Sequence, residues 1–138
     1  MRLKEEDARE RLESVPVVHL ATADETGCPH VVVATFAVDG ERVYTAVDAK
    51  PKSSRDLKRL HNIRENPRVA VLADHYEDDW TRIWWVRGDA TATIIEDPDG
   101  MALPIALLQE RYHQYRDDPP AGPVIAMTVE HWTGWAYT

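Results

Sequence analysis

The sequence is poor in cysteine, glycine and phenylalanine, and it has no long apolar run. Its 138 residues include one cysteine, six glycines and one phenylalanine. The single cysteine, Cys28, excludes an intramolecular disulfide and indicates a reducing compartment. No stretch approaches the ~20 apolar residues of a membrane span, and the opening MRLKEEDARERLES lacks the apolar region of a signal peptide. We therefore expect a cytoplasmic protein with no membrane association, folded as one domain over residues 1–138.

Positive charge is scarce overall but concentrated in one segment. The chain has 16 Lys and Arg against 24 Asp and Glu, a net charge of −8, which argues against nucleic-acid binding because phosphate backbones require a basic face. Residues 50–68 hold seven of the cations and two acidic residues, so this segment carries +5 and the remainder −13. Cations at the start of a helix favour a phosphate site. A solvated amphipathic helix is the alternative.

Residue alternation and β-branched runs predict seven, mostly antiparallel strands. Asp39-Gly40 is a hairpin turn signal, so the first three strands should form a meander. The second is apolar enough that both of its faces are expected to be covered. Gly88 is expected to mark a bulge or bend in a long strand. The expected strands are 17–22, 29–38, 41–47, 68–73, 81–95, 124–130 and 132–137.

Two or three helices are predicted, at 3–13, 55–64 and 97–115. For the second helix we expect a cap at Ser53 or Ser54. Its inward positions are predicted to be Leu57, Leu60, Ile63 and Arg64, and its outward positions Lys58, Arg59 and Asn62. Strands that return on themselves through short turns favour a closed or nearly closed antiparallel barrel, with an open sandwich as the alternative.

No metal or nucleophile motif is present. The six histidines show no HxxxH or HExxH spacing, and one cysteine provides no thiolate pair. His75 stands in an acidic stretch, residues 74–79, which we interpret as a solvated loop rather than a cation site. Ser53 and Ser54 lack a Gly-x-Ser-x-Gly context. We expect no metal and assign no catalytic acid or base.

Two stretches carry a family resemblance. Residues 17–74 read VVHLATADETGCPHVVVATFAVDGERVYTAVDAKPKSSRDLKRLHNIRENPRVAVLAD, and residues 78–93 read DDWTRIWWVRGDATAT. In this order, the strands, the Asp-Gly hairpin, the Lys/Ser/Arg turn and the Asn-Pro-Arg strand resemble the split β-barrel flavin-binding superfamily typified by pyridoxamine 5′-phosphate oxidase. More narrowly, the chain resembles the PPOX-class coenzyme F420-dependent enzymes. The resemblance implies a mainly β, α+β fold, an antiparallel split β-barrel, and a homodimer with one cofactor at each end of the subunit interface.

The resemblance also implies a cofactor site. The ring would lie along the strand edges at residues 32–36 and 43–46, and the phosphate would sit on the turn and helix start at residues 50–58. The tryptophans are expected to pack in the core or at the dimer interface, and the alternative is that Trp80 or Trp85 walls the pocket. The residues expected to bind the cofactor are Val33, Thr35, Tyr44, Thr45, Lys50, Lys52, Ser53, Ser54, Arg55, Lys58, Trp80 and Trp85.

The expected cofactor is coenzyme F420, because the resemblance is to the F420-dependent branch and the extra cations Lys50, Arg59 and Arg64 would suit the phospholactyl and oligoglutamate tail of F420; FMN is the alternative. The resemblance implies an oxidoreductase that transfers a hydride between the deazaflavin and an unidentified small substrate. Three other functions stay open: an FMN-dependent oxidoreductase, a cofactor-binding protein with little turnover, and a heme-degrading relative, for which no histidine is placed as an axial ligand.

Overall fold

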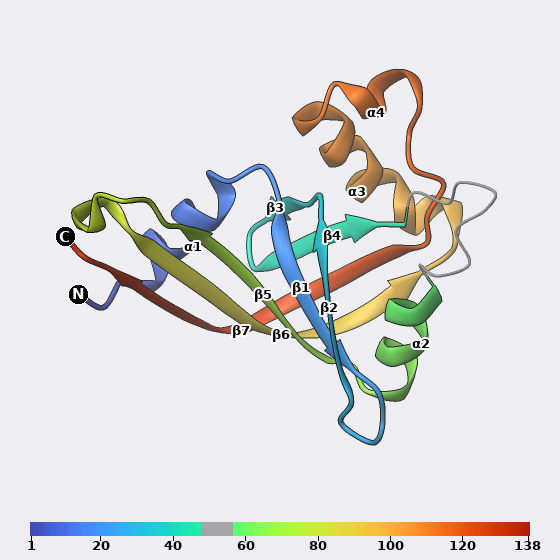
Figure 1. Cartoon of the computed structure of the whole chain (residues 1–138). Helices are drawn as coiled ribbons and strands as arrows, with labels where there is room; N and C mark the ends of the chain where they lie inside the picture. The colour runs from blue at the N-terminus through green and yellow to red at the C-terminus, as the bar shows by residue number, and fades with distance from the viewer. Residues whose placement is uncertain (48–56) are drawn as a thin grey trace.

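The computed structural model describes residues 1–47 and 57–138 (Figure 1). Strands account for most of the regular structure, and helices cover the ends of the sheet. The strands are β1 (Val18–Ala23), β2 (Pro29–Ala34), β3 (Ala37–Asp39), β4 (Arg42–Ala46), β5 (Arg68–His75), β6 (Trp84–Ile95) and β7 (Val124–Ala136). The helices are α1 (Glu5–Glu13), α2 (Leu57–Glu65), α3 (Pro98–Arg111) and α4 (Gln114–Asp117), with a short 3-10 helix, η2 (Trp80–Arg82).

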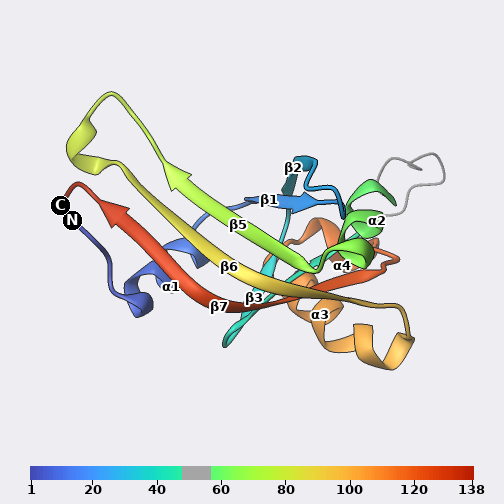
Figure 2. The same ribbon diagram turned by 90° about the horizontal axis from the view of Figure 1, so that it is seen from below.

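One antiparallel sheet contains all seven described strands, in the order β2-β1-β5-β6-β7-β4-β3. Strands β2 and β3 are therefore at opposite edges, although only Thr35 and Phe36 separate them in the chain. Three residue steps span at most about 11 Å, so the sheet must curl until its two edges approach each other. Figures 1 and 2 show this curl. The prediction of a split β-barrel in a mainly β, α+β fold is confirmed.

The prediction of one strand over residues 29–38 is wrong. Its first part, β2, pairs with β1, and its last part, β3, pairs with β4. The predicted three-strand meander is therefore replaced by a crossing from one edge of the sheet to the other. The crossing places the Phe36 side chain in the core, where it is 0% exposed. The expectation that both faces of β2 are covered also fails within this chain, because Val31 and Val33 are 61% and 59% exposed.

The two predicted C-terminal strands are one strand, β7, which pairs along the whole of β6. Asp89 pairs with His131 and Ala90 pairs with Val129, so Glu130 is the extra residue of a β-bulge. Where the sequence predicts a boundary between two strands, at residue 131, the structure thus has a β-bulge within one strand. Gly88, beside it, has another role: a Cβ there would lie 3.2 Å from the side chains of both Val71 and Val129, so it permits close packing in the core.

Helix α1 buries Ala8 and Leu12, and α2 matches its predicted inward and outward positions only in part. Leu60 and Ile63 are buried as expected. Asn62, predicted to face outward, is 0% exposed, and its Nδ2 donates to Thr22 Oγ1 at 3.0 Å. Arg64, predicted to face inward, is exposed, and its Nη2 lies 3.5 Å from Glu96 Oε1. Both differences follow from the docking of α2 on β1 and β6. The predicted cap residues, 53 and 54, lie outside the described residues.

The predicted helix 97–115 is two helices, α3 and α4. Asp97 caps α3, because its Oδ2 accepts from the Gly100 N–H at 2.7 Å. Helix α3 packs on β3, β4 and β7, and α4 packs on α3. These two helices lie at the end of the sheet away from α1 and the chain termini (Figure 1). Within the described parts of the chain, no helix is long and apolar enough to cross a membrane.

Candidate functional site

The structure brings three of the predicted cofactor residues, Val33, Thr35 and Thr45, to one hollow of about 210 Å³. We call it the crossover hollow, because it lies where the chain passes from β2 to β3. It is built from β2, the crossing, β4, α2 and α4. Its lining residues are Val33, Ala34, Thr35, Thr45, Ala46, Val47, Arg59 and Tyr115. The last residue described before the cationic segment, Val47, is in this wall.

The crossover hollow combines apolar walls with hydrogen-bonding groups. Thr35 Oγ1 and the Tyr115 hydroxyl are hydrogen-bonded at 2.9 Å. Arg59, on the first turn of α2 and predicted to face outward, is half-buried in the wall. Such a lining can hold a planar ring on its apolar side, hydrogen-bond a polar edge, and bind an anion.

Tyr115 is a lining residue that the sequence did not predict. Its only signal is the pair Tyr112 and Tyr115 within the otherwise polar stretch RYHQYRDD. The two rings contact edge to face, with centroids 5.7 Å apart. Nothing local indicates that a helix between β6 and β7 reaches the crossing between β2 and β3.

Tyr112 holds the crossing in place. Its hydroxyl accepts from the Phe36 backbone N–H at 3.0 Å and from Arg111 Nε at 3.2 Å, and it donates to the Pro16 carbonyl at 2.8 Å. The Arg111 guanidinium lies 4.3 Å from the centre of the Phe36 ring. A hydroxyl has one donor and two acceptor sites, so the Tyr112 hydroxyl is fully used. Helix α3 thereby fixes the backbone next to Thr35.

The other predicted cofactor residues either do not line the crossover hollow or fall outside the residues that the structure describes. Tyr44 is 4% exposed and packs in the cluster beneath α3. Lys58 is exposed on α2, and Trp80 is 67% exposed in η2. Lys50, Lys52, Ser53, Ser54 and Arg55 fall within residues 48–56, so their roles stay predictions.

Trp85 lies on the outer face of the sheet. Val86 is 0% exposed inside the barrel, whereas Trp85 and Arg87 are half-buried on the opposite face, as alternation predicts. The Arg87 guanidinium is 5.9 Å from the Trp85 ring centre. Together with Val31 and Tyr76, both residues line a largely apolar hollow of about 490 Å³.

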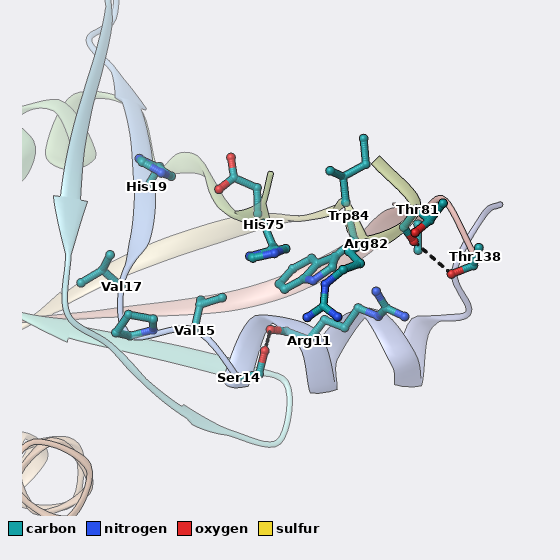
Figure 3. A pocket seen from close by; sticks show the side chains of 14 residues that line it. Arg11, Ser14, Val15, Val17, His19, His75, Thr81, Arg82, Trp84 and Thr138 are labelled. Carbon is teal, nitrogen blue, oxygen red and sulfur yellow. Dashed lines mark hydrogen bonds between the residues drawn. The ribbon is translucent and has the colours of Figure 1, made fainter. Parts of the chain in front are cut away.

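A third and larger hollow, of about 740 Å³, lies between α1, β1 and the start of β6 (Figure 3). We call it the α1 hollow. One rim is the acidic stretch of residues 74–79, whose side chains bond to one another and to Arg82. His75 and Arg82 both bond Glu77, and these contacts, chiefly the hydrogen bond with His75, hold the pKa of Glu77 below its usual value. Hydrogen bonds from Thr81 likewise lower the pKa of Asp79. Among the residues described, no group of three or more His, Cys, Asp or Glu is arranged to hold a metal ion.

Comparison with solved structures finds the same fold in proteins of low sequence identity. An FAD-binding protein from Mesorhizobium loti matches with a TM-score of 0.77 and 21% identity over 97% of this chain and 95% of that chain. HutZ, the heme storage protein from Vibrio cholerae, matches with a TM-score of 0.73 and 21% identity, covering 99% and 95%. The FAD-binding protein from Mycobacterium smegmatis matches with a TM-score of 0.66 and 16% identity, covering 98% of both chains.

The sequence matches a family profile but no individual curated protein. The family profile of pyridoxamine 5′-phosphate oxidase matches residues 5–136, which is nearly the whole chain and includes every element of the sheet. The match agrees with the curled seven-stranded sheet and with the resemblance noted in the sequence. The chain therefore belongs to the pyridoxamine 5′-phosphate oxidase family.

Proposed function

We propose that this protein is an oxidoreductase that binds coenzyme F420 at the crossover hollow and transfers a hydride between it and a small substrate. One observation carries the proposal. Val33, Thr35 and Thr45, which the family resemblance assigns to the cofactor ring, line one hollow together with Arg59. In sequence, this hollow adjoins the segment 50–68 with its net charge of +5.

The residues of the crossover hollow fit such a cofactor in part. Val33 and Val47 offer apolar contact to a flat ring, and the paired hydroxyls of Thr35 and Tyr115 offer hydrogen bonds to its polar edge. The volume of about 210 Å³ is below the roughly 300–1,000 Å³ of most ligand sites. This small volume favours a site whose wall is completed by a further chain.

A second copy of the chain would supply the rest, and we propose a homodimer. Strand β2 is an edge of the sheet, and its Val31 and Val33 are 61% and 59% exposed. Exposed valines on an unpaired edge favour association. Val33 also lines the crossover hollow, so a subunit that covered β2 would close the same hollow.

When bound, a reduced deazaflavin supplies the hydride, a proton with two electrons, to an unsaturated acceptor. The protein's residues bind, orient and exclude water. Thr35 and Tyr115 would orient the polar edge of the ring. Arg59 and the cations of residues 50–58 would hold the anionic tail. The net charge of +5 over residues 50–68 suits several anions better than the single phosphate of FMN.

The test is a titration of the purified protein with coenzyme F420 and with FMN, followed by tryptophan fluorescence. We expect tighter binding of coenzyme F420 and, with its reduced form, turnover of a hydride acceptor. Tyr115→Phe and Thr35→Val should each weaken cofactor binding roughly five- to tenfold for one lost hydrogen bond. Tyr137→Phe, which changes an exposed ring outside the hollow, is the matched control.

Each other result points to a named alternative. Tighter binding of FMN would favour an FMN-dependent oxidoreductase, a candidate supported by the two FAD-binding structural relatives. Tight binding of coenzyme F420 without turnover of any acceptor would favour a cofactor-binding protein. Binding of neither would refute the proposed function.

A further inference from the structure

Two arginines of α1 make the same contact with a tryptophan but differ in their charge partner. The Arg9 guanidinium lies 5.8 Å from the centre of the Trp132 ring and pairs with the carboxylate of Glu41. The Arg11 guanidinium lies 5.7 Å from the centre of the Trp84 ring. No residue in 1–47 or 57–138 gives Arg11 a carboxylate partner. Arg11 is half-buried, so an anion beside it would be stabilised more than on an open surface.

Arg11 faces the α1 hollow, which has the size of a small-molecule site. Its volume of about 740 Å³ is within the roughly 300–1,000 Å³ typical of such sites. Figure 3 shows Arg11 beside Trp84, with Val15 and Val17 along the wall toward His19. The hollow therefore offers the Arg11 guanidinium, a flat aromatic surface and aliphatic contacts.

The remaining charges at the hollow limit what it can bind. Arg82 and His75 are both engaged by Glu77. Asp74 is exposed on the lining and would repel a second negative charge. The Ser14 hydroxyl donates to the backbone carbonyl of Arg11 at 2.6 Å, a contact that does not involve the guanidinium. A single carboxylate suits this arrangement better than a phosphate dianion, and its two oxygens match the guanidinium fork.

We propose that the α1 hollow binds a small planar monocarboxylate. Its carboxylate pairs with Arg11 in the way that Glu41 pairs with Arg9, and its apolar body lies against Trp84 and Val17. The site shares no residue with the crossover hollow. It lies toward α1, at the opposite end of the sheet from α2 and α4 (Figure 1). The inference is thus independent of the proposed cofactor.

The test is isothermal titration calorimetry with naphthalene-2-carboxylate and its neutral analogue, naphthalene-2-carboxamide. The wild-type protein should bind the carboxylate about tenfold or more tightly than the carboxamide, as expected for a charge-assisted pair. Arg11→Gln should abolish this preference. Arg9→Gln is the matched control, because Arg9 makes the equivalent contact outside the hollow, and it should keep the preference.

Four results would overturn the proposal. They are no binding of either compound by the wild-type protein, equal binding of both, an unchanged preference in Arg11→Gln, and a preference lost in Arg59→Gln instead, which would place the probe in the crossover hollow. If Arg11→Gln does not fold, Val17→Phe replaces it. This substitution adds bulk to the wall and should weaken binding of the carboxylate at least fivefold; unchanged affinity would overturn the location.

Discussion

Replacing Tyr112 with Phe removes the hydroxyl that ties the crossing between β2 and β3 to α3. The hydroxyl makes three hydrogen bonds, to the Phe36 N–H, Arg111 Nε and the Pro16 carbonyl. The Pro16 bond is exposed, so water can replace it at little cost. The other two are partly buried, and the Phe36 N–H would be left unpaired.

The expected loss follows from these contacts. An unpaired, partly buried N–H costs about 1–3 kcal/mol, and the bond from the charged Arg111 adds about 1 kcal/mol once solvation is counted. Arg111 keeps its bond to the Val15 carbonyl and its contact with Phe36, which limits the damage. We expect Tyr112→Phe to lower the free energy of unfolding by about 2–3 kcal/mol, a fall of roughly 7–10 °C in Tm for a chain of this size.

The assay is urea unfolding followed by tryptophan fluorescence, with calorimetry for Tm. Tyr137→Phe, at an exposed ring, should change stability by less than about 0.5 kcal/mol. If Tyr112→Phe also lowered the free energy of unfolding by less than about 0.5 kcal/mol, the proposed role of the Tyr112 hydroxyl in holding the crossing would be refuted. The variant should also weaken cofactor binding, because Thr35 is next to the released N–H of Phe36.

Three further predictions concern other parts of the molecule. Asn62→Ala should lower the free energy of unfolding by about 1–3 kcal/mol, because it leaves the buried Thr22 hydroxyl without its partner; an unchanged urea midpoint would contradict this. The pKa of Glu77 lies below its ordinary value of 4.5, so its contribution to stability is present above that value and is lost as pH falls through the folded-state pKa. Stability curves from pH 6 to 3 should therefore fall less steeply in Glu77→Gln than in the wild-type protein. Val33→Lys should shift the proposed homodimer toward monomer in sedimentation velocity and weaken cofactor binding, whereas Ala102→Lys, on exposed α3, should do neither.

Local sequence pattern was sufficient for the elements that depend on near neighbours. The Asp39-Gly40 hairpin formed as predicted, and a helix begins close to the predicted residue 97, because a tight turn and a helix start depend on backbone geometry within a few residues. The order of motifs along the chain also pointed to the correct family. These features need no information about distant segments.

Tertiary contacts decided the rest. Residues 29–38 are mostly apolar and contain no turn signal, so nothing local marks the break at Thr35-Phe36. The break occurs because the sheet curls and the chain must cross between its edges. Asn62 is buried because α2 docks with that face on Thr22. Tyr115 reaches Thr35 across 80 positions of sequence, and Arg11 meets Trp84 only when α1 packs against β6. Each of these contacts joins distant segments, so the folded chain, rather than any local pattern, brings the walls of both hollows together.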